Sequence, residues 1–318
     1  MNSPFKKKKG RPWLNNLRWG AEFALVEGLT CLLSPLSAQT VYRMGCCLGG
    51  WLYALPGKRK RIAMTNLGIA FGNSLTRREK KRIYRESVTQ VVISVLQCFW
   101  ILRDTENRVH QLIPSKPEGL DILEGCLSRG KGVFFLTAHY GNWEVMGLDH
   151  GYRNVGRLNS IVRCLDNPKL EKTTCDLRTR SGNGIFYREE SPLKIVRAIK
   201  NNQCVAVMMD QNSAKGGMFV DFFGQKAATA RSIAALAYKT GAAIIPLFCY
   251  PQGDGTYKVE YGPELLPPIS GDKKMDVIVW TQACQKFIES VITKQPEYWM
   301  WFHRRWKTRP PEETHRIY

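Results

Sequence analysis

Three short, uninterrupted apolar runs, separated by segments of helical periodicity, constrain most strongly what this chain can fold into. The runs lie at residues 132–137, 204–209 and 242–248. An apolar run of this length is typical of a strand that is buried on both faces of a sheet. Segments with helical spacing at residues 193–200 and 230–240 precede the second and the third run. Strands that alternate with helices predict a largely parallel sheet with helices on both faces.

The neighbouring segments extend this pattern into one α/β domain. Further helices are expected at residues 119–128, from Trp143 onward and at residues 275–292. Residues 257–261 alternate between apolar and polar side chains and are expected to form an antiparallel edge strand. No internal repeat or low-complexity linker divides the chain. We therefore predict a single domain over residues 61–318.

A long helical segment precedes the first predicted strand. Apolar residues recur with helical spacing from residue 62 to about residue 112. Thr76 is the expected N-cap of a helix within this segment, and Glu79, three residues later, completes a capping box.

The first sixty residues are basic at both ends and apolar between them. Basic clusters at residues 6–11 and 58–61 enclose an apolar stretch at residues 19–56, which Ser34 and Pro35 break in two. A membrane-spanning helix needs about 20 uncharged apolar residues. Neither half supplies them, because the first half contains two glutamates and the second half is too short.

Residues 1–60 are therefore predicted to form a membrane-associated segment of two short embedded or interfacial helices. Basic residues beside apolar helices attract anionic lipid and favour the cytoplasmic side of a membrane. A pair of helices buried in a soluble core remains the alternative. The segment has no clear cleavage site of a signal peptide.

The composition indicates an anionic partner. Lys and Arg number 47 against 27 Asp and Glu, which gives a formal net charge of +20. Such a charge fits nucleic acid, an anionic membrane or a phosphorylated substrate. Nucleic acid is not expected, because the sequence has neither zinc-finger spacing nor an RNA-recognition signature. The ten cysteines include no C-x-x-C pair and indicate a reducing, cytoplasmic environment.

The most promising chemical site follows the first predicted strand. His139 comes directly after that strand, at the sheet edge where chemistry gathers in open α/β folds. Gly141 permits a tight turn and Asn142 is a suitable N-cap for the next helix. Glu144 then falls in the first turn of that helix. A loop His and a helical Glu can meet, so that the carboxylate orients the imidazole as a base for a hydroxyl.

A purely structural interpretation of the same residues stays open. Asn142 can serve only as a cap, and Glu144 can serve only to complement the helix dipole. His139 would then be a structural residue. Spacing by itself does not decide between these interpretations.

Further segments after His139 and Glu144 make the chain recognisable. They are the Arg-containing and Asn-Pro segment at 162–168, the Arg-Gly segment at 178–182, Asp210-Gln211 with the Phe-Phe-Gly block at 222–224, and the aromatic and basic segment at 296–307. Together with the His–x4–Glu motif they cover roughly residues 50 to 310. In these segments the chain resembles the bacterial lipid A biosynthesis acyltransferases, within the lysophospholipid acyltransferase superfamily.

The resemblance implies acyl transfer without a cofactor or a metal. His139 would take the proton from an acceptor hydroxyl as that hydroxyl attacks a thioester, and Glu144 would hold the correct tautomer of His139. Arg163 and Arg180 would contact phosphate groups, or would be ordinary surface charge. Asp210 would lie near the site and order a loop, or would simply form a turn.

The resemblance also implies the partners and the location. The expected donor is an acyl carrier protein thioester and the expected acceptor is a lipid A precursor, at the cytoplasmic side of the inner membrane. The same chemistry with acyl-CoA and another glycolipid or lysophospholipid remains the alternative.

Overall fold

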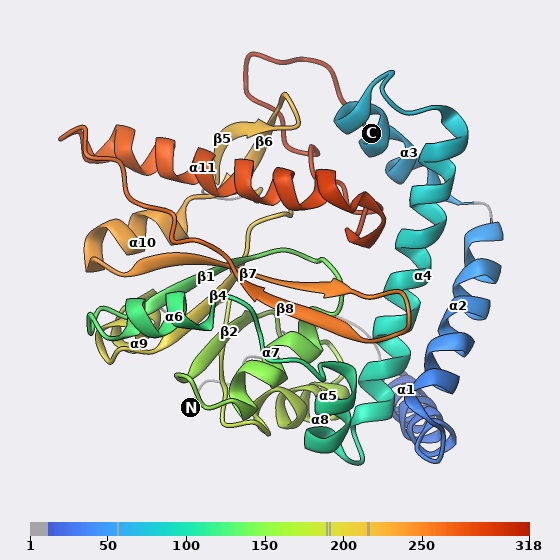
Figure 1. Ribbon diagram of the computed structural model, residues 1–318. Helices are drawn as coiled ribbons and strands as arrows, with labels where there is room; N and C mark the ends of the chain where they lie inside the picture. Colours follow the sequence, from blue (N-terminus) through green and yellow to red (C-terminus); the bar gives the residue numbers. More distant parts are fainter. Residues whose placement is uncertain (1–11, 56, 189, 191, 215–216) are drawn as a thin grey trace.

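A six-stranded sheet forms the centre of the computed structural model, which describes residues 12–318 except 56, 189, 191, 215 and 216. The predicted basic cluster at residues 6–11 lies outside these residues. The strand order is β3-β2-β4-β1-β7-β8 (Figure 1). The strands are β1 (Val133–Thr137), β2 (Leu158–Val162), β3 (Gly184–Tyr187), β4 (Cys204–Met208), β7 (Ala243–Pro251) and β8 (Tyr257–Tyr261).

All neighbouring strands are parallel except β8, which pairs antiparallel with β7 at the edge. This confirms the predicted largely parallel sheet, and β8 is the expected antiparallel edge strand.

Helices cover both faces of the sheet. Successive side chains of β1 point to opposite faces and are all apolar up to Leu136, so both faces must be buried. Phe134 and Leu136 belong to one core, and Val133 and Phe135 belong to the other. The first core is covered by α9 (Pro192–Lys200), α10 (Ser232–Thr240) and α11 (Lys273–Lys294). The second is covered by α5 (Thr105–Leu112), α6 (Leu120–Leu127), α7 (Trp143–Tyr152) and α8 (Pro168–Thr179).

Two strands of the sheet and one helix were not predicted. β2 includes Asn159 and Ser160 within its five residues, and β3 has only four residues, so neither forms a long apolar run. Asn159 is buried and uses its amide to donate to Gln203 and to the carbonyl of Cys204. α8 begins after the N-cap Asn167, in a segment that had been treated only as a motif.

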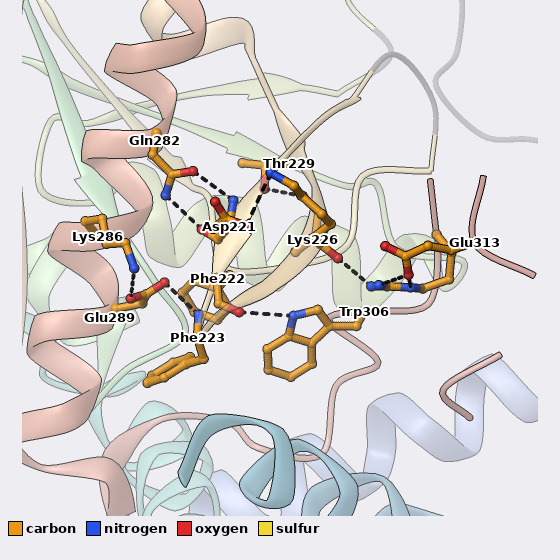
Figure 2. A network of polar contacts seen from close by, with 12 residues as sticks. Asp221, Phe222, Phe223, Lys226, Thr229, Gln282, Lys286, Glu289, Trp306 and Glu313 are labelled. Carbon is orange, nitrogen blue, oxygen red and sulfur yellow. Dashed lines mark hydrogen bonds and ion pairs between the residues drawn. The ribbon is translucent and has the colours of Figure 1, made fainter. Parts of the chain in front are cut away.

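A separate hairpin of β5 (Gly217–Phe222) and β6 (Gln225–Ala230) lies against α11. Its two-residue turn holds Phe223 and Gly224 at φ values of 52° and 72°, the conformation that tight hairpins require. Phe223 is a costly residue at positive φ, and Glu289 accepts a hydrogen bond of 2.6 Å from its backbone N–H. Figure 2 shows that Gln282 also exchanges two hydrogen bonds with the backbone of Asp221.

The first four helices of the described residues are α1 (Pro12–Leu33), α2 (Ala38–Ala54), α3 (Lys58–Phe71) and α4 (Arg77–Ile101). The break between α1 and α2 confirms the predicted interruption at Ser34 and Pro35. The capping box of Thr76 and Glu79 is present at the start of α4. α4 crosses the end of the sheet and contributes to both cores, and α1 and α2 lie outside it (Figure 1).

α2 packs closely along α4 because two glycines face that helix. A Cβ atom at Gly45 would lie 2.6 Å from Ile93, and one at Gly49 would lie 2.5 Å from the Cα of Thr89. α2 and its C-cap also expose large apolar side chains, namely Met44, Leu48, Trp51, Leu52 and Leu55. Within the described residues, no helix combines the length and the apolar character that crossing a membrane requires.

The charged residues of α1 face the rest of the protein. Glu22 forms an ion pair with Arg18 and accepts a hydrogen bond of 2.9 Å from Asn167. Glu27 forms an ion pair with Arg103 of the loop after α4. Leu17, Leu25 and Leu32 of α1 are exposed, whereas Leu33 is buried in the core.

Candidate active site

His139 lies in the turn between β1 and α7, as predicted. Gly141 shapes this turn at φ +58°, and any side chain there would collide with the backbone oxygen of Cys249 at 2.0 Å. Asn142 is the N-cap of α7, because its Oδ1 accepts a hydrogen bond from the N–H of Val145. The local sequence therefore fixes where the imidazole leaves the sheet.

Asp210 holds the imidazole of His139 from the end of the neighbouring strand β4. The Nδ1 of His139 lies 3.0 Å from Oδ1 of Asp210, and the backbone N–H of His139 donates to Oδ2 at 3.0 Å. The indole N–H of Trp299 donates to the same Oδ2 at 2.9 Å. The side chain of Asp210 is 2% exposed and that of His139 is 20% exposed. The carboxylate is therefore fixed on three sides, and the imidazole remains accessible.

Electrostatics favour the charged forms of this pair. Burial lowers the pKa of His139, but the charge of Asp210, its hydrogen bond and the charge of Glu144 outweigh burial and raise that pKa above its ordinary value. Burial raises the pKa of Asp210, but the charge of His139 and the hydrogen bonds from His139 and Trp299 outweigh it, so this pKa is lowered. An imidazolium formed during a reaction is stabilised here.

The hydrogen bonds also define which nitrogen of His139 can act as a base. Nδ1 faces a carboxylate and therefore carries the proton, as assigned from its partners. Nε2 lies 3.2 Å from the amide nitrogen of Gln211, which donates to it. Nε2 is thus an unprotonated acceptor, the state that a general base needs.

Arg305 supports Gln211 from within the protein. Its side chain is buried and donates to the carbonyl oxygens of Gln211 and Ala228, at 3.4 Å and 2.8 Å. It also donates to Thr229 and Gln285. Burial lowers the pKa of Arg305 to about 10, which leaves the guanidinium charged at neutral pH.

Glu144 occupies the first turn of α7 but does not form the predicted contact with Nδ1. Its carboxylate binds Arg178 of α8 in a bidentate pair, with Nε at 2.9 Å and a terminal nitrogen at 2.5 Å. The charge of Glu144 still raises the pKa of His139. The expected brace on the imidazole is provided by Asp210, because the carboxyl end of β4 lies closer to Nδ1 than the helix does.

A cavity of about 400 Å³ lies beside His139 and is lined by strands of the sheet and by residues of α7 and α8. Polar residues at one end include His139, Glu144, Arg163 and Arg178. The remaining wall is mostly apolar and includes Met146, Leu148, Leu158, Ile161, Ala206, Met208 and Leu247. The volume lies within the range of about 300–1,000 Å³ that is usual for ligand sites.

The two predicted phosphate-binding arginines differ in position. Arg163 is exposed and lines the cavity. Arg180 is not among the cavity's lining residues, and its guanidinium donates to the carbonyl of Leu102 and to Thr105, both at 2.7 Å. Its contacts tie the end of α8 to the end of α4. Within the described part of the chain, no group of three residues is arranged to hold a metal ion.

Sequence reasoning missed three residues of the site: Arg178, Gln211 and Trp299. Arg178 and Gln211 lie within segments that had been recognised as motifs, but no local pattern indicated what they contact. Trp299 comes from the aromatic and basic segment at residues 296–307, for which the sequence indicated no contact with the site. Its indole reaches Asp210 because Tyr140 and Trp299 form a β-bridge.

Comparison with known proteins identifies relatives over most of the chain. The chain is 25% identical over 292 residues to a lipid A biosynthesis lauroyltransferase of Escherichia coli strain K12, which covers 89% of this chain and 90% of the relative. It is 26% identical over 316 residues to a lipid A biosynthesis palmitoleoyltransferase of the same strain, with 96% and 97% covered. A phosphatidylinositol mannoside acyltransferase of Mycobacterium tuberculosis is 28% identical over 192 residues, with 59% and 58% covered.

A family model also matches nearly the whole chain. The model described as bacterial lipid A biosynthesis acyltransferase matches residues 8–308 of the 318. The match includes the turn with His139, the Asp210 strand end and the closing aromatic segment. The chain therefore belongs to the bacterial lipid A biosynthesis acyltransferase family and is an acyltransferase.

Proposed function

We propose that this protein is an O-acyltransferase that moves a fatty acyl chain from a thioester donor to a hydroxyl of a lipid A precursor. The observation that carries the proposal is the His139–Asp210 pair at the mouth of an apolar cavity of about 400 Å³. A base beside a largely apolar cavity suits a reaction in which one substrate is a fatty chain.

The reaction begins with proton transfer from the acceptor hydroxyl to Nε2 of His139. The hydroxyl oxygen attacks the thioester carbonyl, the C–O bond forms, and the C–S bond then breaks. The departing thiolate takes the proton back from Nε2. Asp210 keeps the proton on Nδ1 and stabilises the imidazolium, and Glu144 adds a second negative charge nearby.

Gln211 occupies the place where the acceptor hydroxyl must bind. Its amide already donates to Nε2 at 3.2 Å, so a substrate hydroxyl has to displace it. The displaced amide can donate to the oxyanion that develops on the thioester carbonyl, since side-chain amides serve this role in acyl transfer.

The apolar wall of the cavity is the proposed site of the acyl chain. Each buried methylene contributes about 0.8 kcal/mol, so the depth of the cavity sets a preferred chain length. Arg163, at the polar end, is the proposed contact for phosphate of the donor or acceptor. The contacts of Arg180 with Leu102 and Thr105 favour a supporting role for that residue instead.

The donor and the acceptor each have one alternative. An acyl carrier protein is the proposed donor, and acyl-CoA is the alternative. A different glycolipid is the alternative acceptor, because one relative is named as an acyltransferase for phosphatidylinositol mannoside.

We further propose that residues 1–60 bind the inner (cytoplasmic) membrane and that residues 61–318 form the acyltransferase domain on its cytoplasmic side. The support is the exposed apolar side chains of α1 and α2, beside the basic start of α3. Exposed apolar side chains beside basic residues favour binding at the interface of an anionic membrane. Anionic lipid is thus the proposed membrane partner, and nucleic acid is not.

The decisive experiment presents purified protein with both donors and with several acceptors. Transfer from acyl carrier protein to a lipid A precursor, lost in His139→Ala, is the expected result. Transfer only to a glycolipid or a lysophospholipid would replace the acceptor assignment. Full transfer by His139→Ala would refute the proposed base.

A further inference from the structure

A second cavity, also of about 400 Å³, lies on another side of the catalytic turn. It is lined by Arg59 of α3, Tyr84 and Val88 of α4, and Met300, Phe302 and His303 of the C-terminal segment. It shares no lining residue with the acyl cavity. The reaction described above does not use it.

A backbone hydrogen bond joins the wall of this second cavity to the residue proposed as the base. The backbone N–H of Met300, in its wall, donates to the carbonyl of His139 at 3.1 Å. His303 lies close enough to His139 and Asp210 for their charges to act on its pKa. The wall of the second cavity is therefore joined by one hydrogen bond to the turn that carries His139.

The wall of the second cavity is apolar with two polar groups. Tyr84, Val88, Met300 and Phe302 provide apolar surface. The buried Nδ1 of His303 has no hydrogen-bond partner, and burial lowers the pKa of His303 to about 4, so the ring is neutral.

Arg59 supplies the positive charge. It belongs to the basic cluster at residues 58–61, and one terminal nitrogen donates to the carbonyl of Phe302 at 3.2 Å. A guanidinium has five N–H donors, so most remain for a ligand. A charged guanidinium above an apolar wall is complementary to an anionic group attached to a lipid.

The position relative to α2 favours a lipid that comes from a membrane. Trp51 and Leu55, near the end of α2, are 77% and 61% exposed, and they precede Arg59 closely in the chain. If the apolar side of α2 lies in a membrane surface, Arg59 lies beside the headgroup layer.

We propose that this second cavity binds the acceptor lipid, with a phosphate group of the lipid at Arg59 and its uncharged part against Tyr84, Val88 and Met300. The proposal rests on the acyl transfer proposed above and adds the site of the second substrate. The acyl chain of the donor and the acceptor lipid then bind in different cavities.

The test compares steady-state kinetics of Arg59→Gln with those of the wild type on two acceptors, a phosphorylated lipid and the same lipid without its phosphate. Loss of charge-assisted hydrogen bonds is expected to raise the KM of the phosphorylated acceptor by about 10- to 100-fold. The KM of the acceptor without phosphate changes far less. Arg59→Lys restores part of the effect.

Two further variants sharpen the result. Arg78→Gln removes the same charge at an exposed position outside the cavity, and its KM values are expected to equal those of the wild type. Val88→Trp fills the apolar part and raises the KM of both acceptors. Should Val88→Trp fail to fold, Arg59→Gln alone decides the question.

Three results would overturn the inference. The first is an unchanged KM in Arg59→Gln, and the second is an equal rise in Arg59→Gln and Arg78→Gln, which would indicate general attraction to the membrane. The third is competition by inorganic phosphate as strong as that by the phosphorylated lipid. Each leaves the role of His139 intact, whereas transfer by His139→Ala would remove the proposed function itself.

Discussion

Replacing Asp210 by asparagine tests the chemistry of the site most directly. In the wild type, Oδ2 accepts from two fixed donors, the backbone N–H of His139 and the indole N–H of Trp299. The amide NH2 of an asparagine cannot face those donors, so its oxygen must take the Oδ2 position. Its NH2 then takes the Oδ1 position and faces Nδ1 of His139.

This arrangement reverses the tautomer of His139. Nδ1 must accept from the new amide, and the ring proton moves to Nε2. Nε2 can then no longer take a proton from an acceptor hydroxyl. Losing general-base catalysis costs about 10²- to 10⁴-fold in turnover, which corresponds to about 3–5 kcal/mol of transition-state stabilisation.

The assay is kcat for acyl transfer, together with ¹⁵N NMR of the imidazole to identify the protonated nitrogen. Asp149→Asn is the matched control, because Asp149 is also fully buried but is bonded to Arg153; its kcat is expected to stay within about 3-fold of the wild type even if thermal stability falls. Turnover of Asp210→Asn within about 3-fold of the wild type, or a proton that remains on Nδ1, would refute the assignment of Asp210.

Four other outcomes are expected. Glu144→Gln lowers kcat by about 10²-fold but keeps the proton on Nδ1, because Glu144 bonds to Arg178 and acts on His139 through its charge; a reversed tautomer by NMR would contradict this. The kcat/KM of the wild type falls as the pH drops through a pKa above the ordinary 6.5 of histidine, since only the neutral imidazole accepts a proton and its pKa is raised; a midpoint below 6.5 in a pH–rate profile would count against the carboxylate pair. Gly147→Leu fills part of the acyl cavity, where a new Cβ has room because its nearest neighbour, a side-chain atom of Leu158, lies 4.0 Å away. If two methylenes of the acyl chain lose their place, the preference shifts toward a shorter donor by about 15-fold. Competition assays with donors of graded chain length measure this preference, and an unchanged preference would place the acyl chain elsewhere. Trp51→Glu weakens binding to anionic vesicles in flotation assays, because Trp51 is exposed on α2. Lys226→Glu, in the hairpin of β5 and β6, is the control. Equal binding of both variants would argue against α2 as the membrane contact.

The sequence determined the elements whose signals are local. The caps at Thr76 and Asn142 depend on residues within one helical turn, and both are present. The runs that became β1, β4 and β7 are apolar on both faces, so their strands were predictable. β2 and β3 were not, because β2 contains polar residues and β3 is short, and their burial depends on neighbours distant in the chain.

The partner of His139 could not be predicted because it depends on strand order. β4 lies beside β1 although β2 and β3 come between them in the sequence. Their parallel register places Met208 opposite Thr137, and this brings Asp210 to His139. Glu144 was the only acidic residue nearby in the sequence, so local spacing favoured it. Its carboxylate instead neutralises Arg178, which approaches from α8.

The C-terminal segment completes the hydrogen bonds around His139 and Asp210, and this affects when the proposed active site can form during synthesis. Trp299 donates to Asp210, Met300 donates to the carbonyl of His139, and Arg305 donates to the carbonyl of Gln211. A ribosome-bound chain that has emerged only as far as α11 can already form most of the sheet, yet Asp210 still lacks its indole partner. Acyl transfer is therefore expected to begin only after residues 299–305 have been synthesised and have packed against the sheet.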